Sequence, residues 1–242
     1  DIQQVEAKNK IIDEPTPEVE TDMNEYLKIE DLDQRIAKYI KENPDFLIKT
    51  LQEYQNKQNQ IEQEKLNNQN LSNIEKLNSQ THSMFIGNDN SDIQIFEFVD
   101  YNCGYCLKFH NEVSSVISQE SSLKLVIIQM PILGKMSDEL SKLALASSLQ
   151  GKFNEVHNYL YSSKRKSSME DILADLFIMN IDITQLKKDI ESEAVQKLSS
   201  QHEKIVNDFK FVGTPAIIIG NTIIPGFIKA DEISEILKKE FF

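Results

Sequence analysis

The chain has 242 residues, of which 40% are hydrophobic and 27% are charged, and its formal net charge is −13. This length suits one large domain or a domain with an appendage. The acidic excess argues against nucleic acid and anionic membranes as partners, and no apolar run approaches the length that crosses a bilayer. The start of the sequence has neither the basic residues nor the apolar stretch of a secretory signal, so we interpret the chain as cytosolic or already processed.

The N-terminal third predicts helices without a globular core. Residues 1–23 are acidic and contain two prolines, which predicts a disordered tail. Residues 24–86 are expected to be helical, with a linker. Their apolar stripe breaks at Asn43–Pro44 and consists of Ile29, Leu32, Ile36, Tyr39, Leu47, Leu51 and Tyr54. Because such a stripe needs a surface to cover it, we predict an oligomerisation stalk; packing on the main domain is the alternative.

Residues 52–70 are dominated by Gln and Asn, which fits either an exposed helix or a flexible linker. A short apolar stripe of Leu71, Ile74 and Leu77 follows.

Residues 87–242 predict an α/β catalytic domain. Ile93–Val99 predicts a strand, the segment from Cys103 to about Ser118 a helix, and Leu123–Met130 a strand buried on both faces. Two short strands, Ala216–Ile219 and Thr222–Ile224, are expected as a hairpin before a last helix that begins at Ala230.

A helical insert is expected between these strands, over about residues 133–210. Within it Ser137 predicts an N-cap, Gly151 a helix end, and Asp182 with Gln185 a capping box.

The two cysteines, Cys103 and Cys106, lie where the first strand passes into a helix. The free N–H groups of a helix N-terminus favour a thiolate at Cys103. We therefore expect Cys103 to attack substrate disulfides and Cys106 to resolve the mixed disulfide, with Gly104 and Tyr105 tuning the sulfur's surroundings.

Other uses of the cysteine pair fit less well. A c-type haem site needs histidine at the position of Leu107. Zinc needs about four ligands, whereas Cys103, Cys106 and His110 could supply three. No cofactor and no metal are expected.

Glu97 lies in the strand that leads to the cysteines. Strand alternation places Ile93, Ile95, Glu97 and Val99 on one face, and a carboxyl group among aliphatic side chains should have a raised pKa. Glu97 could then exchange a proton with Cys106. The alternative is an exposed glutamate at the edge of a half-solvated strand.

Three segments carry a resemblance to a known family: Phe96–Cys106 (FEFVDYNCGYC), Val212–Ile217 (VGTPAI), and Pro225–Gly226 before the last helix. With these, residues 90–242 resemble the bacterial DsbA-like and DsbC-like proteins of the thioredoxin superfamily. The resemblance implies a thioredoxin fold with a helical insertion.

The resemblance also assigns roles. It implies Cys103 as nucleophile, Cys106 as resolving cysteine and Glu97 as a buried acid. It further implies that Pro215 is cis beside the thiols, and that Thr214 offers backbone groups to a bound peptide, as an added strand would.

Cys-Gly-Tyr-Cys and the threonine before Pro215 look like disulfide isomerases of the DsbC type, because strong oxidases typically carry Pro-His and valine there. The N-terminal third resembles the helical stalk of ScsC-like proteins and of trimeric DsbA-like isomerases of alphaproteobacteria. This implies a periplasmic homo-oligomer, a trimer rather than a dimer, with its signal peptide removed. It would act on misfolded, disulfide-containing proteins and be reduced by a membrane redox partner. A monomeric disulfide oxidase and a copper-binding thiol protein are the alternatives.

Overall fold

The computed structural model describes residues 29–80, 82–162 and 164–242. The acidic tail expected over residues 1–23 lies outside the described residues. The chain divides into two compact units between Glu62 and Gln63.

The first unit contains helix α1 (Ile29–Glu42) and the beginning of helix α2 (Pro44–Asn78). The two helices are separated at Asn43, whose side-chain amide donates to the carbonyl O of Tyr39 at 2.9 Å. The Tyr39 ring meets Phe46 edge to face, with centroids 6.1 Å apart. Helix α2 continues without interruption through residues 52–70, so this segment is an exposed helix.

The last turns of α2 belong to the core of the second unit. Ile74 and Leu77 are each only 2% exposed, and Asn73 donates from Nδ2 to the carbonyl O of Asp208 at 2.8 Å. Strand β1 (Phe85–Gly87) follows, and the sequence analysis did not predict it. The second unit therefore begins well before Gly87, where the change in sequence character placed the start of the catalytic domain.

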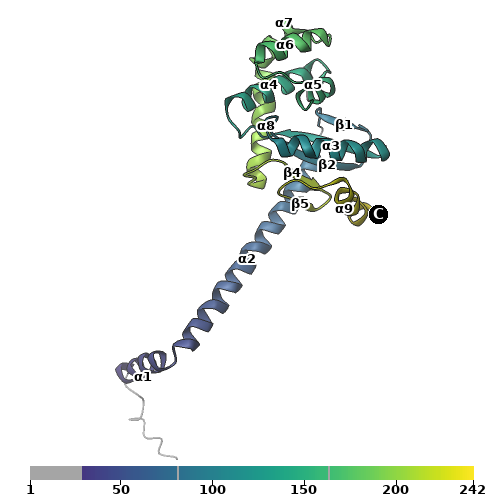
Figure 1. Ribbon diagram of the computed structural model, residues 1–242. Helices are drawn as coiled ribbons and strands as arrows, with labels where there is room; N and C mark the ends of the chain where they lie inside the picture. Colours follow the sequence, from purple (N-terminus) through teal and green to yellow (C-terminus); the bar gives the residue numbers. More distant parts are fainter. Residues whose placement is uncertain (1–28, 81, 163) are drawn as a thin grey trace, which may run out of the picture. The chain divides into compact units, whose positions relative to one another are not determined.

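A five-stranded sheet in the order β1-β3-β2-β4-β5 forms the centre of this unit (Figure 1). Strand β2 (Ile93–Val99) pairs in parallel with β3 (Leu123–Gln129) and antiparallel with β4 (Ala216–Ile219), which forms a hairpin with β5 (Thr222–Ile224). The predicted strands are confirmed, and every residue of β3 is buried, as expected of a strand covered on both faces.

The sheet has two buried faces with different coverings. One face, which includes Ile95 and Val99, packs on helices α3 (Gly104–Gln119) and α9 (Ala230–Phe241) and on the helical insert. The other face, which includes Phe96 and Phe98, is covered by the ends of α2 and α8.

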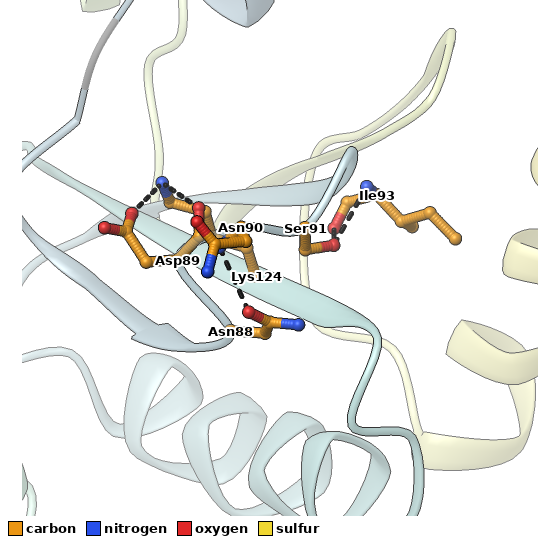
Figure 2. Close-up of polar contacts among 6 residues, drawn as sticks. All are labelled: Asn88, Asp89, Asn90, Ser91, Ile93 and Lys124. Carbon is orange, nitrogen blue, oxygen red and sulfur yellow. Dashed lines mark hydrogen bonds and ion pairs between the residues drawn. The ribbon is translucent and has the colours of Figure 1, made fainter.

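Polar contacts hold the loop between β1 and β2 against the sheet (Figure 2). Lys124 of β3 is 7% exposed, and its Nζ lies 2.7 Å from Asp89 Oδ1 and 4.3 Å from the centre of the Phe85 ring. The backbone N–H of Asn90 donates to Asn88 Oδ1 at 3.0 Å. A buried ammonium group needs such partners, so this loop keeps Lys124 from being an uncompensated charge.

The helical insert consists of five helices: α4 (Lys135–Leu149), α5 (Phe153–Leu160), α6 (Met169–Ile178), α7 (Ile183–Ile190) and α8 (Glu193–Phe209). Asp182 caps α7 by accepting from the backbone N–H of Gln185 at 2.9 Å. Gly151 follows α4 with a φ of 68°, as a helix end requires.

The prediction that Ser137 is an N-cap is wrong. Helix α4 begins two residues earlier, with Gly134 at the capping position. Ser137 is buried in the first turn, and its hydroxyl accepts from Asn102 Nδ2 at 3.0 Å. Its polar group therefore supports the turn before Cys103 rather than the start of α4.

Within the described ranges, no helix combines the length and the apolar character needed to cross a bilayer.

Candidate active site

Cys103 is the N-cap residue of α3, and Cys106 lies in its first turn. The turn Asp100–Asn102 connects them to β2, and the backbone N–H of Cys103 donates to the carbonyl O of Asp100 at 3.0 Å. Both cysteines are free thiols; Cys103 is 9% exposed and Cys106 is fully buried. Of the two sulfur atoms, only that of Cys103 can therefore be reached from solvent.

The two thiols differ in acidity. Burial raises the pKa of Cys103, but hydrogen bonds involving Thr214, Cys106 and Tyr105 outweigh burial and bring the pKa below its ordinary value. Sγ of Cys103 also donates to the carbonyl O of Thr214 over 3.2 Å, and this bond by itself stabilises the protonated thiol. The hydrogen bonds that lower the pKa of Cys103 have the larger effect. For Cys106, burial and then the nearby Glu97 carboxyl raise the pKa well above its ordinary value. The pair thus combines an accessible thiol of lowered pKa with a buried thiol of raised pKa.

Glu97 is fully buried in β2, on the sheet face that includes Ile95 and Val99. The predicted alternation is confirmed, and the alternative of an exposed edge glutamate is wrong. Neither carboxyl oxygen has a hydrogen-bond partner among the described residues. Burial, and then interaction with Cys103, raise the pKa of Glu97 well above its ordinary value. The group can therefore hold a proton at a pH where an exposed glutamate would be ionised.

The Thr214–Pro215 peptide bond is cis, and it precedes β4 directly. Pairing of β4 with β2 brings this bond beside the cysteines, where the Thr214 carbonyl contacts Cys103. Pro215 is buried and Thr214 is half-buried.

Gly104 and Tyr105 form the exposed rim of the motif. Apart from its chain neighbours and the backbone of its own helix, no heavy atom lies within 4 Å of the position that a Cβ of Gly104 would take. Tyr105 is 59% exposed, and its ring centre lies 6.3 Å from that of Phe227 and 4.9 Å from Lys108 Nζ.

Asp100 is a site residue that the sequence analysis treated only as part of a turn. Its carboxylate is 1% exposed and accepts three backbone N–H groups: Asn102 on Oδ1 at 2.8 Å, and Ile132 and Leu133 on Oδ2 at 2.8 and 2.9 Å. It thereby ties the turn before Cys103 to the loop after β3. The bond to Asn102 follows the local pattern of an Asx turn, but the partners in the loop after β3 have no signal in the sequence.

His110 was considered as a metal ligand beside the cysteines, and the structure gives it different neighbours. Its Nδ1 lies 3.3 Å from Nε2 of His157, whose Nδ1 lies 2.9 Å from the Tyr101 hydroxyl. Burial lowers the pKa of both histidines, which favours the neutral form of both rings. In the part of the chain that the structure describes, no three His, Cys, Asp or Glu side chains are grouped to share a metal ion.

The chain is similar to known proteins in both sequence and structure. A thioredoxin family model matches residues 78–239. The probable disulfide bond formation protein D of Bacillus cereus is 25% identical over 169 residues, which cover 64% of this chain and 77% of that protein.

Two solved structures are similar as well. The thiol-disulfide exchange protein alpha-DsbA2 from Wolbachia pipientis superposes with a TM-score of 0.63 at 26% identity, covering 72% of this chain and 96% of that one. Proteus mirabilis ScsC in a transitional conformation superposes with a TM-score of 0.62 at 22% identity, covering 90% of this chain and 98% of that one. The chain belongs to the thioredoxin family, and it is a thiol–disulfide oxidoreductase.

Proposed function

We propose that this protein is a homo-oligomeric protein disulfide isomerase. The observation that carries the proposal is the apolar surface of α1 and the first half of α2. Nine large apolar side chains there are each 38–61% exposed: Leu32, Ile36, Tyr39, Ile40, Phe46, Leu47, Ile48, Leu51 and Tyr54. So many exposed apolar side chains along two helices are typical of an interface, and a second copy of the same helices would bury them.

The chemistry of isomerisation follows from the different acidities of the thiols. The Cys103 thiolate attacks a wrong disulfide, one substrate sulfur leaves as a thiolate, and a Cys103–substrate disulfide forms. The released substrate thiolate then attacks a second substrate disulfide, and the thiolate freed in that step displaces Cys103 from the mixed disulfide. The substrate then has new disulfides, and no net electrons have moved.

Cys106 releases the substrate when the mixed disulfide with Cys103 is not displaced by a substrate thiolate. Its sulfur displaces the substrate thiolate, so the substrate is reduced by two electrons and a Cys103–Cys106 disulfide forms. Glu97 would exchange a proton with Cys106, and Thr214 and Pro215 would align the substrate backbone beside the sulfur. A membrane redox partner would then return both cysteines to thiols.

Joining several copies through α1 and α2 supports this activity physically. Two or more reduced sites on one assembly raise the effective concentration of thiolate near a misfolded substrate. A trimer is the assembly that the resemblance to ScsC-like proteins favours. Substrate disulfides form and persist in oxidising compartments, and we infer the bacterial periplasm.

A disulfide oxidase is the second candidate, because the Bacillus relatives bear the name of disulfide bond formation proteins. In that function the Cys103–Cys106 disulfide would be the starting state and would pass to the substrate. The two functions differ in the direction of electron flow and in reduction potential, not in the site residues.

Full-length protein carrying both Leu47→Glu and Leu51→Glu tests the proposal. Helix geometry places Asn56 and Gln60 on the opposite face of α2, so Asn56→Glu with Gln60→Glu is the control that adds the same charge. Light scattering should find a multimer for the wild type and the control, and a monomer for the apolar-face variant. Reactivation of ribonuclease with scrambled disulfides should fall only in that variant, while all three proteins reduce a small disulfide equally. A monomeric wild type that oxidises a reduced peptide rapidly but reactivates no scrambled ribonuclease would instead establish the oxidase.

A further inference from the structure

Basic side chains lie near Cys103, although the whole chain has a formal net charge of −13. Four basic residues, Lys108, Lys164, Arg165 and Lys166, come from α3 and from the connection between α5 and α6 (Figure 1). We call them the basic collar.

Three contacts place Arg165 and Lys108 of the collar beside the motif. Arg165 donates from Nη1 to the carbonyl O of Tyr101 at 2.9 Å and from Nη2 to Asn102 Oδ1 at 3.3 Å, in the turn immediately before Cys103. Its chain neighbours Lys164 and Lys166 are exposed. Lys108 Nζ lies over the exposed ring of Tyr105, a residue that stands between Cys103 and Cys106 in the sequence.

Acidic side chains do not neutralise the collar. In residues 29–80, 82–162 and 164–242, none of its four members is in an ion pair, whereas Lys135 on the neighbouring α4 pairs with Glu139 at 3.5 Å. Two carboxyl groups on neighbouring segments have other partners. Asp100 is buried under three N–H donors, and Asp175 accepts from the Tyr159 hydroxyl at 2.8 Å.

The collar does not touch the sulfur of Cys103. The contacts of that sulfur are with Thr214 and with the start of α3. The charges of the collar therefore act on a substrate that approaches the thiol from solvent. Acidic groups on the substrate would speed its association with the protein, and basic groups would slow it.

We propose that the basic collar selects substrate segments in which acidic residues flank the reacting cysteine. This rests on thiol exchange at Cys103, and it holds for an isomerase and an oxidase alike. The sign of the effect is diagnostic, because a net charge of −13 acting alone would favour basic substrates.

Three peptides test the proposal, each with one cysteine in a mixed disulfide with thionitrobenzoate and differing only in Asp, Lys or Ser flanks. Reduced full-length protein is mixed with each peptide in a single turnover. The Cys103 thiolate attacks the peptide sulfur, the peptide–aryl disulfide breaks, and the coloured thionitrobenzoate thiolate leaves with the electron pair. Cys106 then displaces the peptide thiol and forms the Cys103–Cys106 disulfide, so two electrons pass from protein to reagent.

At low ionic strength the Asp-flanked peptide should react about tenfold faster than the Lys-flanked peptide, and the difference should shrink in high salt. The variant Lys164→Glu with Lys166→Glu should reverse this order. The control Lys187→Glu with Lys188→Glu makes the same change in net charge at exposed positions of α7, and it should keep the preference.

Equal rates for the three peptides in the wild type, or a faster Lys-flanked peptide, would overturn the proposal while leaving thiol exchange intact. Loss of the preference in the α7 control would overturn it too, because the effect would then belong to net charge. Failure of the Ser-flanked peptide to react at all would refute thiol exchange at Cys103 itself, and the proposal with it.

Discussion

Replacing Glu97 by glutamine should remove one specific pH dependence of folding stability. In the unfolded chain this carboxyl group ionises near its ordinary pKa of 4.5, whereas burial keeps its proton bound to higher pH in the folded protein. Between the two pKa values unfolding releases one proton, so the free energy of unfolding falls as the pH rises.

The size of the effect follows from the linkage. One proton changes the free energy of unfolding by about 1.4 kcal/mol per pH unit, or about 2.7 kcal/mol over two units inside the window. Glutamine has nearly the same shape and never ionises, so Glu97→Gln should lose that slope. The variant should therefore become progressively more stable than the wild type above pH 4.5.

The assay is urea unfolding of the reduced proteins at several pH values from about 5 to 8. The buried histidines are present in wild type and variant alike, so the difference between the two curves reports Glu97 together with its coupling to Cys103 and Cys106. Glu203→Gln, on the exposed side of α8, controls for loss of a carboxylate. Parallel curves for wild type and Glu97→Gln would show that the carboxyl group ionises as freely in the folded protein as in the unfolded chain, and the reasoning from its burial would be wrong.

Three further perturbations test other parts of the structure. At neutral pH, iodoacetamide should alkylate Cys103 and leave Cys106 unmodified, as peptide mass mapping would show; equal labelling would contradict the opposite pKa shifts. Leu77→Ala should lower the free energy of unfolding by about 2–5 kcal/mol, measured in urea, because this side chain of α2 is 2% exposed; a loss below 1 kcal/mol would mean that the end of α2 is not part of the core. Asp100→Ala should cost about 3 kcal/mol and slow the reaction of Cys103, because three backbone N–H groups lose their acceptor; stopped-flow thiol assays at matched fraction folded would separate the two effects, and an unchanged rate would limit Asp100 to a role in stability.

Local patterns predicted those parts of the fold whose structure depends on neighbours in sequence. Alternation in Ile93–Val99 and the turn at Gly220–Asn221 gave the correct strands, and the strand-to-helix step placed Cys103 at a helix start. The same alternation placed Glu97 on one face with Ile95 and Val99, and the structure has this carboxyl group buried.

The errors concern contacts between residues distant in sequence. Strand β1 has only three residues and exists through its pairing with β3, about forty positions later, so it has no pattern of its own. Ser137 has the residue type of a cap, but its hydroxyl is used by Asn102. Arg165 reaches the Cys103 turn from the helical insert, across more than sixty positions. The spacing of residues in the sequence does not predict these contacts between distant segments.

The continuous course of α2 from Pro44 to Asn78 limits how this protein can be divided and recombined. A chimaera that joins a foreign stalk at Gly87 would discard Ile74 and Leu77 and leave Phe96 and Phe98 uncovered on the sheet. A junction near Gln63, with the helical phase kept across it, retains those side chains. A chimaera that keeps this core intact has to retain the last turns of α2 with the second unit, so its junction lies inside a helix rather than in a loop.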